Sequence, residues 1–537
     1  MLDTVPEGCD AFLISGRFPH KTPKWWPDTI ASENLSECAD WAVTADAVAV
    51  SVPASDLQAT KVALAGTGIA VRAKPHQPLS YWLANTCPPN ARIGICGDSW
   101  PFAQAQRIRD FMRKAIGADV YFSVPKTTSE RWRPSKLSAP PRCVNSDLQR
   151  DMRDSQLSAR LICRSEFVGQ VTGLRASNGG ATDAWLLTRK DRLSVVLIGS
   201  KLPVNHLQQL ETAGYLVRHF SELNDLLHNS GPRIGADTNS ISINTANLMG
   251  DKLIHCPEPS PFRFVSPVGR RENAFNDAFD RSMIEVLAHL QRAEQLNEAA
   301  ASKILQAALM KIDGYRSFSF PPIVATDNRT GYPHPPPLKE NLQHQAARCL
   351  LVDAGVHSDT FTTDATRMVF RNNPSNAMQK AYSVVLKALA RASIDQSNLA
   401  SKKDFLVRET LFDAEYEPLH GVGHGTIPGV AVHPYQPLFG VGSAEKIPDQ
   451  VPFSIEPGIY RPNEYGCRLE NLFVCQDQKT QTLTHIPIDV RYALPEIFTP
   501  QEVHWINQYN TRCEEIHGTQ LTREANSWVR VVSRWRG

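Results

Sequence analysis

The first 260 residues alternate short apolar segments with segments of helical periodicity. Apolar runs of strand length occur at 10–15, 41–52, 91–96, 185–188 and 193–198. Apolar positions at helical spacing follow the first three runs at 104–115 and the last two at 205–213. This pattern predicts two successive α/β domains.

The pattern changes in the second half of the chain. Residues 273–310 are strongly helical, because apolar residues recur at helical spacing with charged residues between them. Strands and loops are expected over 321–488. Further helices are expected at 376–392, 402–414 and 499–516. The chain as a whole is therefore expected to be an α/β (α+β) protein.

Two proline-rich segments divide the chain. Residues 125–145 combine proline, serine and basic residues, and residues 257–271 form a second break. The expected domains are 1–140, 145–262 and 268–537. A length of 537 residues fits this number, since a domain typically has about 150 residues.

Composition narrows the range of partners and compartments. Lys and Arg total 57 and Asp and Glu total 55, so a net charge of +2 gives no electrostatic basis for binding nucleic acid or an anionic membrane. The first residues include Asp3 and Glu7 in place of a basic signal-peptide region, and no apolar run is long enough to span a membrane. The 11 cysteines include no CxxC pair, which favours free thiols in a reducing cytoplasm.

The first candidate site is a pair of aspartates in a predicted hairpin. Asp353 and Asp364 lie in apolar, β-branched segments on either side of a Ser-Asp dipeptide at 358–359 that favours a turn. A hairpin centred on this dipeptide places the two carboxylates opposite each other, with Cβ atoms about 5 Å apart. Facing carboxylates repel unless a cation lies between them.

A second pair of acids repeats this arrangement. Glu456 and Glu470 flank a turn-rich centre at 461–464, and a hairpin around that centre places them opposite each other. Either pair alone is more commonly a turn cap or a salt-bridged pair than a metal site, and Arg468 could neutralise Glu470. Two consecutive hairpins with facing carboxylates nevertheless predict a cage for cations.

A histidine-containing loop lies between the two hairpins. The segment LHGVGHGTIPGVAVHP carries His420, His424 and His433 among glycines that let a ligand approach the backbone closely. One imidazole with four carboxylates forms an oxygen-rich shell that suits Mn²⁺, or Zn²⁺ in a mixed nitrogen and oxygen shell. Four carboxylates are too many for one zinc ion and are enough to hold two metal ions about 3.5–4 Å apart around a hydroxide.

The strings around these residues resemble those of the pita-bread metallopeptidases, and in particular the long, three-domain form of Xaa-Pro aminopeptidase (aminopeptidase P). The matching strings are LVDAG and TTDATR within 351–367, HGVGHG at 420–425, SIEPGIY at 454–460 and EYGCRLENL at 464–472, with His433 at the family's spacing. A weaker likeness covers nearly the whole chain, with matches at 10–20, 172–187, 266–273 and 499–515.

The resemblance implies a fold and a set of metal ligands. The fold would be two creatinase-like N-terminal α/β domains followed by a C-terminal pita-bread catalytic domain, which ends in a small extension at about 497–537. The ligands of a dimetal site would be Asp353, Asp364, His424, Glu456 and Glu470. Asp364 and Glu470 would bridge the two ions, and Glu456 would also act as general base and proton shuttle.

The resemblance also assigns roles to four other residues. His334 and His433 would bind substrate and stabilise the tetrahedral intermediate. His420 would line the pocket for the N-terminal residue or proline, and Arg468 would orient a carboxylate.

The implied activity is that of a cytoplasmic dimetal aminopeptidase. It would hydrolyse the bond between an N-terminal residue and a penultimate proline through a metal-bridging hydroxide. The implied substrates are peptides with proline in the second position, the implied cofactors are two divalent ions, Mn²⁺ with Zn²⁺ as the alternative, and the implied assembly is a homodimer.

Two departures from the family keep other functions open. Pro335 stands where the family usually has Tyr, and Pro434-Tyr435-Gln436 stand where it usually has Glu-Gly-Pro. One alternative is a non-catalytic pita-bread protein that binds peptides or proteins. The other is a prolidase-like dipeptidase, although prolidases are usually shorter and lack the region at 499–516.

Overall fold

The computed structural model forms two compact units, which we describe separately. The first contains residues 1–177 and 182–259, and the second contains residues 178–181 and 260–537. The structure describes residues 9–15, 39–74, 78–97, 100–123, 135–137, 141–142, 144–176, 183–190, 192–199, 201–265, 267–294, 296–336, 338, 347–433, 439, 446–477 and 479–535. Pro434-Tyr435-Gln436 and most of the predicted linker at 125–145 lie outside these residues.

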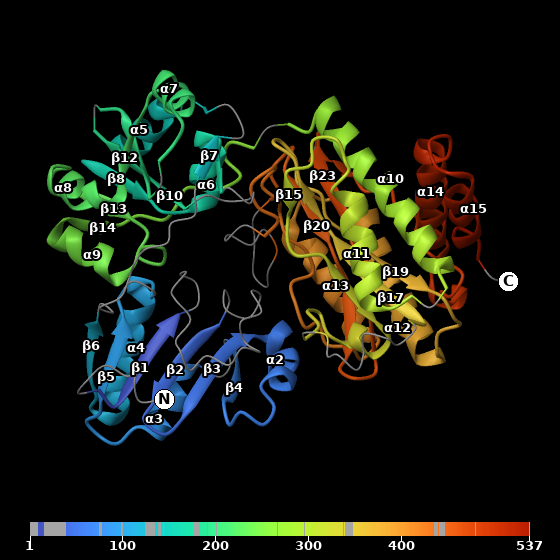
Figure 1. The fold of residues 1–537 in the computed structure, drawn as a ribbon, viewed down its shortest axis with the longest axis horizontal. Coiled ribbons are helices and arrows are strands. Elements are labelled where there is room, and N and C mark those ends of the chain that lie inside the picture. The colour runs from blue at the N-terminus through green and yellow to red at the C-terminus, as the bar shows by residue number, and fades with distance from the viewer. Residues whose placement is uncertain are drawn as a thin grey trace. The chain divides into compact units, whose positions relative to one another are not determined.

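The first sheet of the first unit is mixed and has the strand order β4-β3-β2-β1-β5-β6 (Figure 1). Its strands are β1 (Ala11–Ser15), β2 (Asp40–Thr44), β3 (Val48–Pro53), β4 (Ala70–Lys74), β5 (Arg92–Cys96) and β6 (Asp119–Ser123). Its helices are α2 (Leu57–Ala63), α3 (Leu79–Thr86) and α4 (Phe102–Ile116). The single strand predicted at 41–52 is wrong, because a turn closed by the Thr44 N–H to Ala47 C=O hydrogen bond divides it into β2 and β3.

The second sheet of this unit is also mixed, with the order β12-β11-β10-β8-β13-β14. Its strands are β8 (Ala159–Ile162), β10 (Ala184–Arg189), β11 (Ser194–Ile198), β12 (Tyr215–His219), β13 (Ile234–Ala236) and β14 (Leu253–His255). Its helices are α5 (Asn145–Asp154), α6 (Ser165–Thr172), α7 (Val204–Thr212), α8 (Leu223–His228) and α9 (Ile243–Met249). A short ladder joins β7 (Ser135–Leu137) to β9 (Leu174–Ala176). The strands and helix predicted over 185–213 are confirmed.

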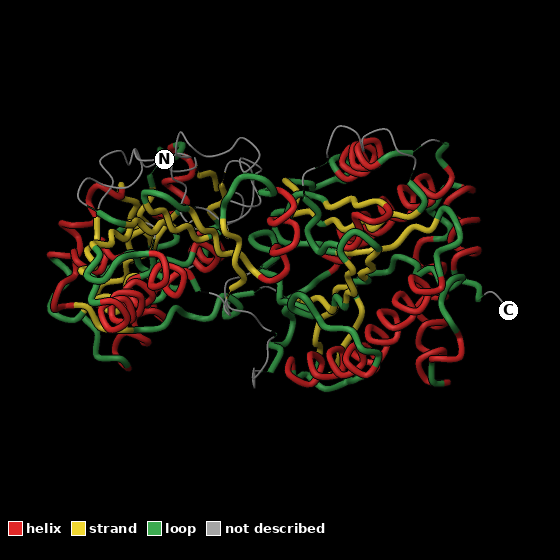
Figure 2. Tube along the Cα trace, turned by 90° about the horizontal axis from the view of Figure 1, so that it is seen from below, coloured by secondary structure: helices red, strands yellow, loops and turns green. Residues whose placement is uncertain are grey.

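Helices surround the strands of the second unit, as the part of Figure 2 near the labelled C-terminus shows. These helices are α10 (Arg270–Arg292), α11 (Glu298–Leu309), α12 (Asn376–Ile394), α13 (Ala400–Asp413), α14 (Pro500–His517) and α15 (Arg523–Val532). The helical character predicted at 273–310 is confirmed, but as two helices, because the Asn297 side chain accepts the Ala300 N–H and starts α11 as a new helix. The helices predicted near 376–392, 402–414 and 499–516 are confirmed, whereas α15 was not predicted.

The strands of this unit form short antiparallel sheets. They are β15 (Ser317–Phe318), β16 (Ile323–Thr326), β17 (Cys349–Ala354), β18 (Val356–His357), β19 (Ala365–Phe370), β20 (Pro452–Ile455), β21 (Gly458–Arg461), β22 (Tyr465–Arg468), β23 (Asn471–Gln476) and β24 (Lys479–Thr482). The sheet orders are β16-β17-β19, β20-β23-β24, β21-β22 and β15-β18.

Strand β17 is buried on both faces. Leu351 belongs to the core cluster that includes α12, whereas Leu350 and Val352 belong to the core cluster that includes α10 and α11. Side chains of a strand alternate between the two faces of a sheet, so β17 lies between two cores. This burial holds the strand that carries Asp353 in one register.

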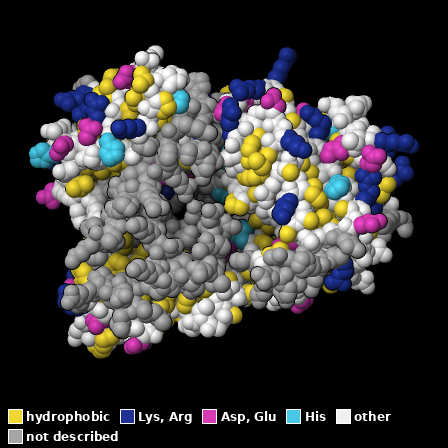
Figure 3. Space-filling model, viewed as in Figure 1, with side chains coloured by type: hydrophobic (Ala, Val, Ile, Leu, Met, Phe, Trp, Pro, Cys, Tyr) yellow, Lys and Arg dark blue, Asp and Glu magenta, His cyan; other side chains and the backbone are white. Residues whose placement is uncertain are grey.

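The surface is in keeping with the near-zero net charge. On the face seen in Figure 3, basic and acidic side chains are interspersed over the described surface. No helix in the described part of the chain combines the length and apolar character that a bilayer crossing requires.

Candidate metal centre

The aspartate hairpin exists, but its register differs from the prediction. Asp353 lies opposite Thr366, not opposite Asp364. The Ser358 hydroxyl accepts the Phe361 N–H (2.9 Å), and the Ser358 N–H donates to the Phe361 carbonyl (2.8 Å). Ser358 therefore occupies the first position of the turn and not a central one. This moves the centre of the hairpin by one residue and the partner of Asp353 by two.

The glutamate hairpin has the predicted register. Ile455 lies opposite Asn471 in one ladder, and Gly458 lies opposite Arg468 in the next. The two ladders continue each other, so Glu456 and Glu470 face each other across the break between them.

His424 brings three of the acids together. Its Nε2 lies 3.4 Å from Asp364 Oδ2, 3.4 Å from Glu456 Oε1 and 3.8 Å from Glu470 Oε1. Two hydrogen bonds to β20 hold the backbone of His424: its N–H donates to Ser454 Oγ (3.0 Å), and its carbonyl accepts the Ser454 N–H (2.7 Å). We call Asp364, His424, Glu456 and Glu470 the central cluster.

The central cluster has buried polar atoms that lack hydrogen-bond partners. These atoms are Asp364 Oδ1, Glu470 Oε1 and His424 Nε2, with Asp353 Oδ1 beside them. Buried polar groups are nearly always bonded, and adjacent carboxylates repel each other. Here carboxylate oxygens and an imidazole nitrogen lie close together without hydrogen-bond donors. Divalent cations bind ligand atoms of this kind.

The protonation of these groups agrees with this fit. Burial first, and the neighbouring carboxylates second, raise the pKa of Asp364, Glu456 and Glu470 well above the usual range. Burial lowers the pKa of His424 to about 4. The imidazole is thus neutral and ready to bind a metal ion at pH 7, while the carboxylates need a cation to become ionised.

Asp353 lies at the edge of the central cluster and has a partner of its own. Arg468 Nη2 donates to Asp353 Oδ2 (2.6 Å), Arg468 Nε donates to Thr366 Oγ1 (3.1 Å), and the Thr366 hydroxyl donates to Glu470 Oε2 (2.9 Å). Arg468 therefore pairs with Asp353, and its hydrogen-bonded link to Glu470 runs through Thr366. One oxygen of Asp353, Oδ1, is left without a hydrogen-bond partner.

A second chain of hydrogen bonds runs from Arg468 to His420. Arg468 Nη1 donates to the Tyr460 hydroxyl (2.5 Å), which lies 2.8 Å from His420 Nε2. Because the Tyr460 oxygen accepts from Arg468, its proton is directed to Nε2 of His420. The Nδ1–H of His420 then donates to the Gly421 carbonyl (2.7 Å). Burial, with Arg468 second, lowers the pKa of His420 to about 3, so this imidazole is neutral.

The remaining predicted residues lie around the central cluster. His433 is exposed, and its ring centroid lies 4.1 Å from that of His424. Ligand atoms of His424, His433 and Glu456 lie within 4.8 Å of one another. His334 is exposed and close enough to His420 to add to the lowering of its pKa, after burial and Arg468. Pro335, which follows His334, is half-buried.

Thr366 and Tyr460 were not predicted. Thr366 follows Asp364 by two residues, so the two side chains lie on the same face of the strand. The alternation of side chains along a strand could therefore have indicated Thr366. Tyr460 is two residues from Gly458, the residue opposite Arg468, and so reaches Arg468 diagonally. Both signals depend on knowing the register.

Two family models match residues of the second unit, which contains the central cluster. The model of metallopeptidase family M24 matches residues 273–477, and the model of the C-terminal region of M24 peptidases matches residues 479–532. The four residues of the central cluster lie inside the first of these ranges.

Several curated proteins are similar in sequence. Aminopeptidase P2 of Arabidopsis thaliana is 22% identical over 513 residues, which cover 81% of this chain and 72% of that protein. Xaa-Pro aminopeptidase app-1 of Caenorhabditis elegans is 30% identical over 236 residues, which cover 40% of this chain and 38% of that protein. The second match thus spans about two fifths of the nematode protein.

Solved structures define the fold. X-prolyl aminopeptidase from Caenorhabditis elegans, described as a cytosolic enzyme with a di-nuclear active site, has a TM-score of 0.85 at 16% identity and covers 99% of this chain and 96% of its own. The prolidase of Pyrococcus horikoshii has a TM-score of 0.53 at 18% identity and covers 64% of this chain and 99% of its own. The predicted fold, two N-terminal α/β domains and a C-terminal pita-bread domain, is confirmed, and the two N-terminal sheets are mixed.

The arrangement of acids around His424, the matched family models and the full-length fold all agree. The chain therefore belongs to metallopeptidase family M24, and within that family it is related to the aminopeptidase P proteins.

Proposed function

We propose that this protein is a dimetal aminopeptidase that removes the N-terminal residue of peptides with proline in the second position. The observation that carries the proposal is the central cluster, in which His424 Nε2 lies within 3.8 Å of three carboxylates and buried ligand atoms lack other partners. Such a cluster is costly to bury without cations.

Five side chains would hold the two ions, namely Asp353, Asp364, His424, Glu456 and Glu470. Two divalent ions would supply the Lewis acidity that makes water nucleophilic near neutral pH. Four carboxylates with one imidazole favour Mn²⁺, with Zn²⁺ as the alternative. Arg468 would orient Asp353, since it donates to one oxygen of this acid and leaves the other free to bind.

Glu456 would move the proton in the reaction. It is half-buried, whereas Asp364 and Glu470 are buried, and it lies beside both His424 and His420. A carboxylate in this position would accept a proton from water and donate it to the proline nitrogen, which is a poor leaving group unless it is protonated.

The histidines around the central cluster would contact the substrate. His433 and His334 are exposed near the central cluster, so they are available to donate hydrogen bonds to the carbonyl oxygen as charge develops on it. His420 is held in a single tautomer by Tyr460 and Gly421, which would give the pocket for the first residues of the peptide a fixed wall.

The architecture supports an aminopeptidase over a prolidase-like dipeptidase. The matched aminopeptidase structure covers 99% of this chain, whereas the matched prolidase covers 64%. By the same likeness we propose a cytoplasmic location and a homodimer. The non-catalytic alternative rests on Pro335 and on residues 434–436, which differ from the family pattern.

Release of the first amino acid from peptides tests the proposal. The purified protein, loaded with Mn²⁺, should release the first residue from an Xaa-Pro-Xaa tripeptide faster than from an Xaa-Pro dipeptide. The reverse preference would identify a dipeptidase. No release with Mn²⁺ or Zn²⁺, together with binding of the intact tripeptide, would identify a non-catalytic protein.

A further inference from the structure

A second group of metal-ligating side chains lies in the same unit, where helix α10 meets the end of α14. Asp277 and Asp280 of α10 and His485, which follows β24, each offer a ligand atom, and these atoms all lie within 4.8 Å of one another. His517, the last residue of α14, places its Nε2 3.9 Å from Asp280 Oδ2. We call these four residues the α10 cluster; none of them belongs to the central cluster.

The α10 cluster contains buried polar atoms that lack hydrogen-bond partners. Asp280 and His517 are each 0% exposed. The atoms without a partner are Asp280 Oδ1, His485 Nδ1 and both ring nitrogens of His517. Asp280 Oδ2, in contrast, accepts the His485 N–H (2.6 Å) and an N–H of Asn276 (3.3 Å). Since buried polar atoms are nearly always bonded, the atoms without a partner point to a ligand. A carboxylate oxygen and the unprotonated nitrogen of a neutral imidazole can each donate an electron pair to a cation.

The charge of the α10 cluster also favours a cation. In the described part of the chain, neither Asp277 nor Asp280 forms an ion pair with a lysine or arginine. Arg281 lies near both carboxylates, with Arg512 near Asp277 and Arg367 near Asp280, yet burial outweighs these cations and raises the pKa of each carboxylate. The two carboxylates are therefore left without a sufficient countercharge from the protein.

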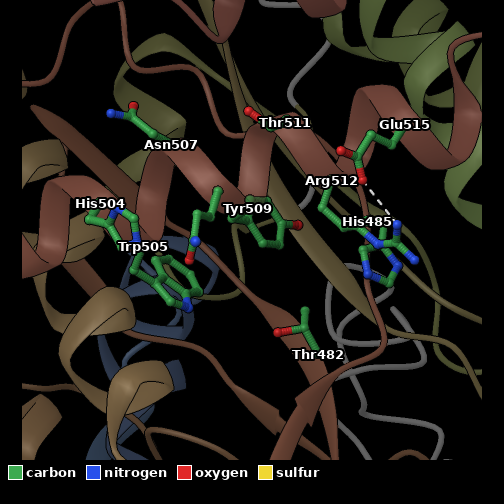
Figure 4. A pocket seen from close by; sticks show the side chains of 10 residues that line it. Thr482, His485, His504, Trp505, Asn507, Tyr509, Thr511, Arg512 and Glu515 are labelled. Atoms are coloured by element: carbon green, nitrogen blue, oxygen red, sulfur yellow. Dashed lines mark hydrogen bonds and ion pairs between the residues drawn. The ribbon is translucent and has the colours of Figure 1, made fainter.

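An open cleft connects the α10 cluster with solvent. The cleft has a volume of about 590 Å³, and His485 lines it together with residues of α14. Figure 4 shows His485 beside Arg512, whose guanidinium is bonded to Glu515 at 3.0 Å. His485 is half-buried and so lies between the cleft and the buried side chains of Asp280 and His517. An ion can reach the cluster from this side.

We propose that Asp277, Asp280 and His485 bind one Zn²⁺ ion, independently of the central cluster, with His517 beside Asp280. Two carboxylates and one imidazole are ligands that Zn²⁺ accepts, and water from the cleft completes the four-ligand shell. The ion joins α10, at the start of the region matched by the M24 model, to His485 in the region matched by the C-terminal model. Its role is structural, because it holds the C-terminal region against α10.

Zinc content and thermal stability test this proposal. After chelation and reconstitution with Zn²⁺, His485→Gln should retain one zinc ion fewer per chain than the wild type, with an affinity for that ion lower by about 100-fold or more. The same variant should lose the zinc-dependent rise of several degrees in Tm. Peptide release with Mn²⁺ should be unchanged. The matched control is His504→Gln, which changes another histidine of the same cleft that lies outside the cluster.

Two further variants separate loss of zinc from poor folding of His485→Gln and from loss of the central cluster. Asp277→Asn changes a half-buried ligand and should give the same loss of zinc even if His485→Gln folds poorly. Asp364→Asn should retain the zinc ion that depends on His485, which separates this proposal from the proposed function. Equal zinc content in the wild type and His485→Gln, or equal losses in His485→Gln and His504→Gln, would overturn the proposal and leave ordered water as the partner of these atoms.

Discussion

The two units bury carboxylates in different ways. The second unit gathers Asp364, Glu456 and Glu470 around His424, where burial first and neighbouring carboxylates second raise the pKa of all three. In the first unit the buried acids are separate from one another: Asp40 pairs with Lys74 at 2.5 Å, and Glu258 Oε1 accepts the Cys163 N–H at 2.9 Å. A single buried acid can remain neutral at modest cost, whereas a group of them forms a stable site only with cations. The number of converging acids, more than burial itself, therefore marks the metal centre.

Removing one acid from the central cluster should have the largest effect. We expect Asp364→Asn to lower kcat/KM by about 10³-fold or more, because loss of a proposed metal ligand would remove several kcal/mol of charge stabilisation. Metal content, measured with activity, should fall in parallel. Full activity with reduced metal content would show that the acids are not a catalytic metal site.

The next effect concerns the arginine at the edge of the cluster. In metal-free protein, Arg468→Met should lower the free energy of unfolding by about 3–5 kcal/mol, since it leaves Asp353 buried without its partner. Denaturant titration measures this change. The control is Arg530→Met, which breaks an exposed pair with Glu514 and should cost about 1 kcal/mol or less. Equal costs would mean that the Arg468 pair contributes no more than a surface pair.

The buried Glu258 of the first unit should make the stability of the protein depend on pH. Burial raises the pKa of Glu258 to about 7, above its usual value of 4.5, so the folded state binds this proton more tightly than the unfolded state. The wild type should therefore lose stability as the pH rises from 4.5 through 7.

Glu258→Gln removes that dependence. It should stabilise the first unit by about 2–3 kcal/mol at pH 8 and have little effect at pH 4.5. Thermal melts at the two pH values measure the difference. Destabilisation at pH 8 would instead show that Arg160 and Arg164, which lie near this acid, hold it in the ionised form.

The smallest effect concerns a glycine beside the second chain of hydrogen bonds. A Cβ at Gly458 would lie 2.4 Å from the Tyr460 hydroxyl, so Gly458→Ala should displace Tyr460 from Arg468 and His420. We expect a loss of about 1–2 kcal/mol in stability and a lower kcat. Gly421→Ala, where the nearest atom lies 3.9 Å away, is the control and should be nearly neutral. Equal activities of the two variants would argue against a role for Tyr460.

Sequence patterns predicted the two α/β domains and most helices of the second unit, because apolar periodicity over ten or more residues is a strong signal. They were less accurate where one side chain decides a boundary. Asn297 divides the helical segment predicted at 273–310, and Ser358 shifts the register of Asp353. The glutamate pair was placed correctly because its ladders resume the same register after the break. The pairing of Asp353 with Thr366 could not be predicted, because the aspartate hairpin has another register than the one expected.

Burial of β17 between two cores has a consequence for how the protein loses activity on heating. A strand packed on both faces cannot loosen locally without exposing both cores, so the position of Asp353 persists until the whole unit melts. Release of metal ions from the proposed site and collapse of the tertiary structure should then occur as one cooperative event, with no warm, folded state that lacks the ions.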